Sequence, residues 1–204
     1  MKKIIAAITV ATALVLTGCS QIGAAATVGS VKITEAQVQK SIDAALAERK
    51  KVATTGMQLE TGAAFNRNQL RFHLIAALIG SVVADLKISV TKAEIDARRA
   101  QILTQLGGEA NLPKALVGAG IASADFNDYL QLILFSEKLA KAEVAAGVKE
   151  SETGTAIQKL VVAKAKKIGV TVNPKYGKWD PATADVLPLD AASPAASPAS
   201  TSTK

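Results

Sequence analysis

The chain has 204 residues, a formal net charge of +7 and only 3% aromatic residues. This length suits one domain with its own core, or one domain and a tail. The low aromatic content argues against the stacking platforms that bind single-stranded nucleic acid. Cys19 is the only cysteine, which excludes an intrachain disulfide.

Residues 1–18 have the features of a secretory signal. Lys2 and Lys3 precede an uncharged apolar stretch, Ile4–Leu16, which is shorter than the roughly 20 residues that cross a bilayer. The sequence Leu16-Thr17-Gly18-Cys19 follows and resembles the lipobox of bacterial lipoproteins. This resemblance implies cleavage before Cys19, lipidation of Cys19 and a chain anchored on the extracytoplasmic side of the cell membrane. The alternative is an ordinary cleaved signal with a chance cysteine.

Residues 19–26 are expected to form a short tether, and an ordered domain is expected over residues 27–180. Thr27–Ile33 predicts two short strands around a Gly-Ser turn. Thr34 and Gln37 have the spacing of a capping box, which predicts that a helix begins there.

A long helix is expected from about Ala63 to Asp85, because its large apolar residues recur at near-helical spacing. Its second half is almost uncharged, which favours the most buried position in the fold. Thr91 and Glu94 form a second capping box, and the helix that they begin should end at Gly107-Gly108.

The rest of the domain should also be helical. Pro113 suits the first turn of a short helix, and Ser123 is expected to cap a longer helix that ends at Gly147. A last helix should stop at Gly169, before a short strand at Val170–Val172. The predicted fold is therefore mainly α, with about six helices and short strands near the N-terminus and near Val170–Val172. Residues 181–204, rich in Ala, Ser, Pro and Thr, are expected to be a disordered tail.

The order of these elements resembles the N-terminal chaperone domain of SurA/PrsA-type foldases, to which the substrate-binding region of trigger factor is also similar. The segments that carry the resemblance are Val28–Thr34, the Arg67-to-Ile79 part of the central helix, Ile88–Asp96, Gly120–Phe126 and Val172–Asp180. No single motif is specific, but their order and spacing match over about Thr27 to Asp180.

The resemblance implies binding of unfolded exported polypeptides, and it does not carry catalysis. Full-length foldases insert a parvulin-type prolyl isomerase domain before the last helix, where this chain has only the loop Gly147–Gly154. His73, the only histidine, is expected to be a packed or edge residue, without a nearby Ser or Cys nucleophile and without partners for a metal. We therefore expect no enzyme activity, no cofactor and no metal site.

A basic run marks the last helix and the segment after it. Lys159, Lys164, Lys166 and Lys167 are a possible basic surface for anionic lipid. The alternative is a solvated helix face whose cations complement the helix dipole. Trp179, the only tryptophan, is expected to pin the chain end to the helical core.

Two functions remain open at this point. The first is a membrane-anchored chaperone or holdase, whose client surface would use apolar positions of the helices in Thr34–Lys51 and Asp125–Ala146. The second is a structural or adaptor lipoprotein that holds one envelope partner. A chaperone should expose a contiguous apolar patch, and an adaptor should show a bounded patch with a polar rim. Nucleic acid is not expected as a partner.

Overall fold

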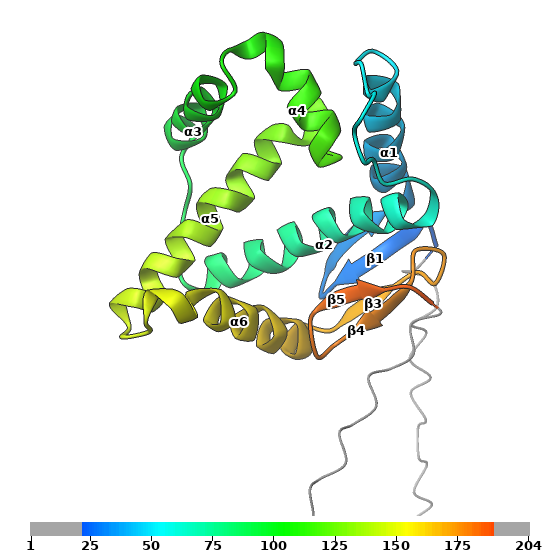
Figure 1. Cartoon of the computed structure of the whole chain (residues 1–204). Coiled ribbons are helices and arrows are strands. Elements are labelled where there is room, and N and C mark those ends of the chain that lie inside the picture. The colour runs from blue at the N-terminus through cyan, green and yellow to red at the C-terminus, as the bar shows by residue number, and fades with distance from the viewer. Residues whose placement is uncertain (1–21, 190–204) are drawn as a thin grey trace, which may run out of the picture.

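The computed structural model describes residues 22–189, and these form a mainly helical fold with a few short antiparallel strands, as predicted (Figure 1). The expected signal peptide (residues 1–18), Cys19, residues 20–21 and residues 190–204 lie outside the described residues. The elements in chain order are β1 (Ala24–Val28), β2 (Val31–Thr34), α1 (Glu35–Arg49), α2 (Gly62–Asp85), α3 (Lys92–Gln105), η1 (Glu109–Asn111), α4 (Leu112–Ala119), η2 (Ser123–Asp125), α5 (Phe126–Ala145), η3 (Glu150–Glu152), α6 (Thr153–Ile168), β3 (Val170–Val172), β4 (Lys178–Asp180) and β5 (Asp185–Leu187).

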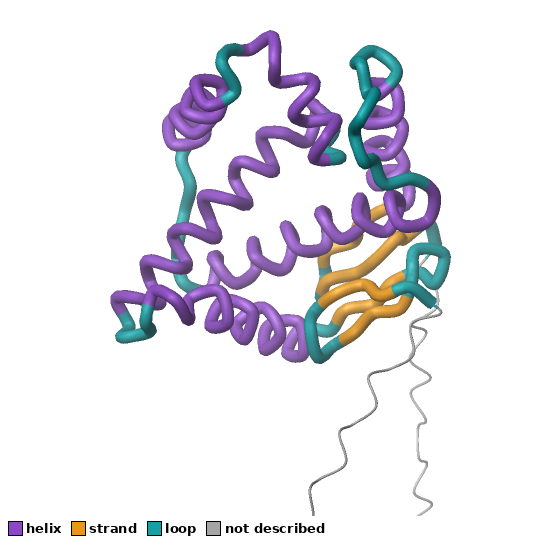
Figure 2. Tube along the Cα trace, in the orientation of Figure 1, coloured by secondary structure: helices purple, strands orange, loops and turns teal. Residues whose placement is uncertain are grey.

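Strand β1 is the centre of a three-stranded antiparallel sheet with the order β2-β1-β3. The hairpin partner β2 follows β1 directly, whereas β3 comes from the far end of the chain, with Val28 opposite Val170. Strands β4 and β5 form a separate hairpin, and both small sheets lie beside α2 (Figure 2). The N-terminal and C-terminal parts of the domain are thus joined in one sheet.

Both predicted capping boxes are present. Thr34 Oγ1 accepts the N–H of Gln37 at 3.1 Å, and Gln37 Oε1 accepts the N–H of Thr34 at 2.8 Å. Thr91 and Glu94 repeat the arrangement at the start of α3. Each box satisfies backbone donors that the first turn of a helix leaves without partners.

Three expectations about boundaries were wrong. Residues 24–26 belong to β1, so the ordered part begins within the expected tether. Residues 181–187 form a turn and strand β5, because Asp180 Oδ1 accepts the N–H of Ala182 and β5 then pairs with β4. The side chain of Ser123 does not cap α5, since a 3-10 turn, η2, precedes that helix.

Helix α2 is the centre of the main hydrophobic core. Leu70, Leu74 and Leu78 are essentially inaccessible to solvent, and they pack with buried residues of β1, α1, α6 and the end of α5. Trp179 packs against this core, as expected. Burial of such side chains is the main favourable contribution to the stability of a domain.

A second, smaller cluster forms where α3 and α4 meet the first half of α5. Its buried residues are Leu112, Leu116, Phe126 and Leu130. Helix α3 has no buried residue of its own and contributes partly buried side chains such as Ile102. Helix α5 therefore connects two hydrophobic clusters, and a cavity lies between them. Within residues 22–189 no helix has the length and apolar character needed to cross a membrane.

Candidate functional site

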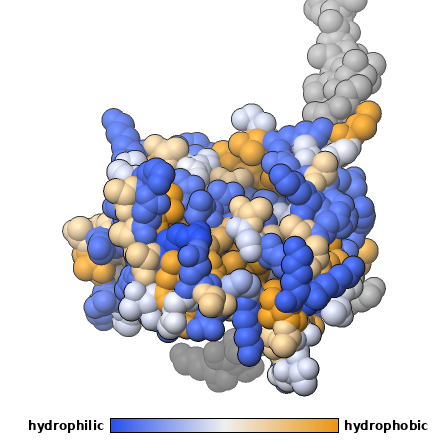
Figure 3. Space-filling view, turned by 90° about the horizontal axis from the view of Figure 1, so that it is seen from above, coloured by the Kyte–Doolittle hydropathy of each residue, from blue (hydrophilic) through white to orange (hydrophobic). Residues whose placement is uncertain are grey.

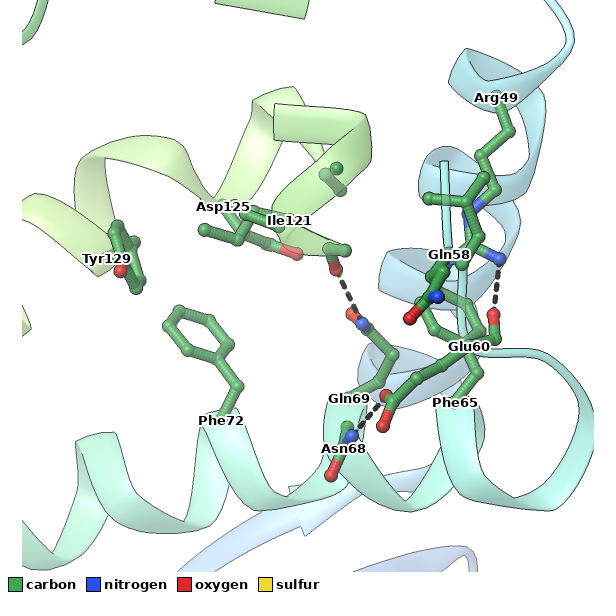
Figure 4. Close-up of a pocket in the computed structure, with 15 residues that line it drawn as sticks. Arg49, Gln58, Glu60, Phe65, Asn68, Gln69, Phe72, Ile121, Asp125 and Tyr129 are labelled. Carbon is green, nitrogen blue, oxygen red and sulfur yellow. Dashed lines mark hydrogen bonds between the residues drawn. The ribbon is translucent and has the colours of Figure 1, made fainter. Parts of the chain in front are cut away.

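A cavity of about 290 Å³ lies between α2, the end of α1 and the segment that joins α4 to α5 (Figure 4). We call it the α2–α5 cavity. Its walls are residues 49, 58–60, 65, 68, 69, 72, 118–122, 125 and 129. The size is at the lower end of the range of ligand pockets, about 300–1,000 Å³, and fits a short segment rather than a large ligand.

Two aromatic side chains face each other across the cavity. Phe72 comes from α2 and Tyr129 from α5, and Figure 4 shows them pointing toward one another. Ile121 lines the same space. Tyr129 and Ile121 pack against the second cluster, whereas Phe65 and Ala122, which also line the cavity, belong to the main core. The cavity thus has an apolar wall made from both parts of the fold.

Arg49, the last residue of α1, supplies a cation at the opposite wall. Its guanidinium carbon lies 4.1 Å from the centroid of the Phe65 ring. One terminal nitrogen donates to the backbone oxygen of Glu60 at 2.6 Å. Burial lowers the pKa of Arg49, and the carboxylate of Glu60 partly opposes this shift. The pKa of a free arginine is so high that the side chain remains charged.

The wall also contains polar atoms without a partner. Among the buried side-chain atoms of residues 22–189, three have no hydrogen-bond partner in the protein: Arg49 Nε, Asp125 Oδ2 and, away from the cavity, Tyr176 Oη. A buried unpaired polar atom costs free energy. Arg49 and Asp125, one a donor and the other an acceptor, both line the α2–α5 cavity, although these two atoms themselves are shielded from solvent.

Long-range hydrogen bonds fix the cavity wall. Gln69 Nε2 donates to the backbone oxygen of Gly120 at 2.8 Å, which joins α2 to the α4–α5 connection (Figure 4). Both carboxylate oxygens of Glu48 accept the N–H of Ser123 at 3.1 Å. The start of η2 is therefore held by α1.

His73 does have a serine beside it, contrary to the sequence-based expectation. Its Nε2 lies 3.0 Å from Ser41 Oγ, because packing of α1 on α2 brings together residues that are 32 positions apart. Burial lowers the pKa of His73, and the carboxylates of Asp125 and Asp128 oppose this shift. Ser41 is only 4% exposed and does not line the α2–α5 cavity, so this pair joins two helices and offers no nucleophile to a substrate.

The four lysines predicted as a possible basic surface differ in their surroundings. Lys159, Lys166 and Lys167 are exposed on α6. The side chain of Lys164 is only 12% exposed and its Nζ lies 2.7 Å from Asp85 Oδ2. Lys164 and Lys167 line a smaller hollow of about 200 Å³ beside Leu86. The acidic partner removes one of the four charges from any basic surface.

Six large apolar side chains are exposed among residues 22–189: Ile22, Val31, Leu46, Leu86, Val144 and Leu189. Ile22 and Leu189 are the two ends of the described chain, and the other four belong to β2, α1, the C-cap of α2 and α5. On the face shown in Figure 3, hydrophobic residues are interspersed with hydrophilic ones. The expected client helices contribute only Leu46 and Val144 to this set.

The described part of the chain contains no group of three or more His, Cys, Asp or Glu residues placed to hold a metal ion. Comparison of the sequence with protein-family models gave no match. Comparisons with curated proteins and with solved structures likewise gave no match.

Proposed function

We propose that this chain is a membrane-anchored, extracytoplasmic holdase that binds segments of unfolded exported polypeptides in the α2–α5 cavity. The observation that carries the proposal is the cavity itself, with an apolar wall from two hydrophobic clusters and an unpaired donor and acceptor beside it. The resemblance to SurA/PrsA-type foldases and the lipobox-like Leu16–Cys19 add support from the sequence.

The chemistry of the cavity suits a polypeptide. Phe72 and Tyr129 offer contact to an apolar side chain. The guanidinium of Arg49 can donate to a peptide carbonyl, and the carboxylate of Asp125 can accept a peptide N–H, since both residues line the cavity. Backbone groups are common to all sequences, and so a site of this kind selects for an extended, apolar segment rather than for one sequence.

The connection between α5 and α6 supports binding without isomerisation. Helix α5 ends at Ala145, and η3 begins at Glu150. Residues 146–149 are the only link between them, so this position holds no inserted domain. The proposed activity is therefore to hold polypeptides, with Cys19 as the lipid attachment site.

A second candidate function is an adaptor for one envelope partner. The observation that favours it is the separation of the exposed large apolar side chains, since a broad client surface would be contiguous. In this case the bounded cavity, with polar groups at its edge, would take a defined segment of the partner.

The two functions are separated by light scattering. A chemically unfolded client is diluted into buffer with and without the soluble chain Ser20–Lys204, which keeps β5 intact. A holdase suppresses aggregation at near-stoichiometric ratios, and the effect persists at high salt because the contacts are apolar. Phe72→Ala should weaken suppression, whereas Leu86→Ala, which removes an exposed side chain outside the cavity, should not.

Absence of suppression with several unrelated clients would contradict the holdase. Retention of a single envelope protein by the wild-type chain, lost in Phe72→Ala, would then support the adaptor. Suppression that disappears at high salt would instead assign the effect to surface lysines.

A further inference from the structure

Both ends of the described chain leave the fold at the same corner (Figure 1). Lys32 Nζ donates to the backbone oxygen of Ile22 at 2.6 Å, which places this lysine at the N-terminal end. The N–H of Asn173 donates to Ala25 at 2.9 Å, and Lys175 Nζ lies 3.1 Å from Glu35 Oε2. The segment after β3 therefore borders the start of β1.

The C-terminal hairpin reaches the same place. Leu187 is opposite Lys178 in the β4–β5 pair, so the antiparallel direction carries Leu189 back toward Tyr176 and Lys175. We call the group of Ile22, Lys32, Lys175, Lys178 and Leu189 the chain-end corner. It combines two apolar and three basic residues.

The chain-end corner is amphiphilic and solvent-exposed. Ile22 is 79% exposed and Leu189 is 62% exposed, the two highest values among the exposed large apolar residues of the described chain. The three lysines are exposed as well. Lys175 forms an ion pair with Glu35, which offsets its charge. The remaining positive charge of the corner comes from Lys32 and Lys178. Apolar side chains among lysines are the composition that favours an anionic membrane interface.

The short segment between Cys19 and Ile22 limits which face of the domain can lie against a membrane. Cys19 precedes Ile22 by three residues, and three residues span at most about 10 Å. A lipid on Cys19 would therefore keep Ile22 within that distance of the headgroups. We propose that the chain-end corner docks on the anionic surface of the bilayer that holds the anchor. The proposal rests on the lipidation of Cys19 that is part of the proposed function.

The α6 lysines are the competing surface, and the topology disfavours them. Helix α6 leads through Gly169 into Val170, which is opposite Val28 at the far end of β1. The length of β1 thus separates this junction from Ile22 by about 13 Å. A tether of about 10 Å holds the Ile22 end, rather than the α6 end, against the membrane.

Docking at this corner would also orient the cavity. The two small sheets and the α2–α5 cavity lie on opposite sides of α2 (Figures 1 and 4). With the corner on the membrane, α3, α4 and the first half of α5 extend away from the bilayer. The cavity would then face the space through which other exported chains pass.

The test uses the single cysteine as a defined anchor. The mature chain Cys19–Lys204 is coupled through Cys19 to a maleimide phospholipid in vesicles of phosphatidylcholine, with or without phosphatidylglycerol. Exposed amines are then acetylated briefly, and the extent of labelling at each lysine is read by mass spectrometry. Because the anchor is attached chemically, the result depends neither on lipidation in the cell nor on binding of unfolded clients.

On anionic vesicles, labelling of Lys178 and Lys32 should fall about fivefold, since one lysine at such a surface shifts its equilibrium by about that factor. Labelling of Lys114 on α4 and of Lys159 and Lys166 on α6 should stay unchanged, which makes them internal controls. High salt should restore labelling at the corner. The double substitution Ile22→Ser/Leu189→Ser should weaken the protection, and Leu86→Ser should not.

Equal labelling on both kinds of vesicle would overturn the docking proposal, as would protection of Lys159 and Lys166 in place of Lys178. Neither result would affect suppression of aggregation by the soluble chain. Conversely, corner protection without suppression of aggregation would leave the docking proposal standing and contradict the holdase.

Discussion

The Glu48 carboxylate caps a helical segment that begins 75 residues later in the chain, because both of its oxygens accept the N–H of Ser123. This bond joins α1 to the start of η2, directly beside the Ile121 and Asp125 positions that line the α2–α5 cavity. The negative charge also faces the positive end of the dipole of the segment that continues into α5. One side chain thus supports both the stability of the domain and the shape of the cavity.

Replacement of Glu48 should therefore loosen the cavity wall. Glu48→Gln keeps the size of the side chain but removes the charge, and we expect the free energy of unfolding to fall by about 1 kcal/mol. Urea denaturation followed by circular dichroism measures this change. Asp43→Asn, which neutralises an exposed acid on the same helix, is the control and should have little effect. Equal losses in both variants would contradict a specific role for the Glu48–Ser123 bond.

The Ser41–His73 pair predicts how stability depends on pH. Burial lowers the pKa of His73 in the folded chain below the usual histidine value of about 6.5. Below that pH the unfolded chain binds a proton more readily than the folded one, so the free energy of unfolding falls as the pH decreases from about 6.5 toward the folded pKa. Above about 6.5 this contribution is fully present. Urea denaturation at a series of pH values measures it.

His73→Gln provides the decisive variant, because His73 is the only histidine in the chain. Gln cannot titrate, and its amide can still reach a hydroxyl partner. The slope of stability against pH should therefore decrease just below about pH 6.5. A slope that is the same in wild type and His73→Gln would show that other groups are responsible.

Replacement of glycine by alanine should have opposite effects on stability at two positions, Gly177 and Gly80. Gly177 precedes β4 with φ of +145°, and an added Cβ would collide with the backbone oxygen of Leu187. Gly177→Ala should therefore destabilise the protein by more than about 1 kcal/mol. Gly80 lies inside α2 with open space at its Cβ position, so Gly80→Ala should stabilise it by about 0.5–1 kcal/mol. Thermal unfolding of both variants tests the pair, and a stabilising Gly177→Ala would contradict the close approach of β5.

Local signals in the sequence were sufficient for the six helices but not for the β4–β5 hairpin. The Thr34 and Thr91 capping boxes identify where α1 and α3 begin, because both partners of each box lie within one helical turn. Gly169 likewise marks the end of α6. Strands β4 and β5 were missed, since each is only three residues long and carries no strand pattern until the other is present to pair with it.

The candidate site is formed by residues that lie far apart in the sequence, so no local sequence pattern could predict it. Gln69 and Gly120 are 51 positions apart, and Ser41 and His73 are 32 apart. Such pairs form only when α1, α2 and the α4–α5 connection pack together. Arg49 is a further example. In the sequence it belongs to the charged end of a helix, which is typical of a solvated residue, whereas in the folded chain its guanidinium lies over the Phe65 ring.

The central position of β1 has a consequence for the order in which the chain can fold. Val28 at the start of the molecule pairs with Val170 near its end, so the sheet is completed only after nearly the whole domain has emerged from a ribosome or a translocation channel. Until then β1 exposes one unpaired edge, which is a site for pairing with other chains. A nascent chain shorter than about residue 172 therefore leaves the β3-facing edge of its first strand open to pairing with other chains.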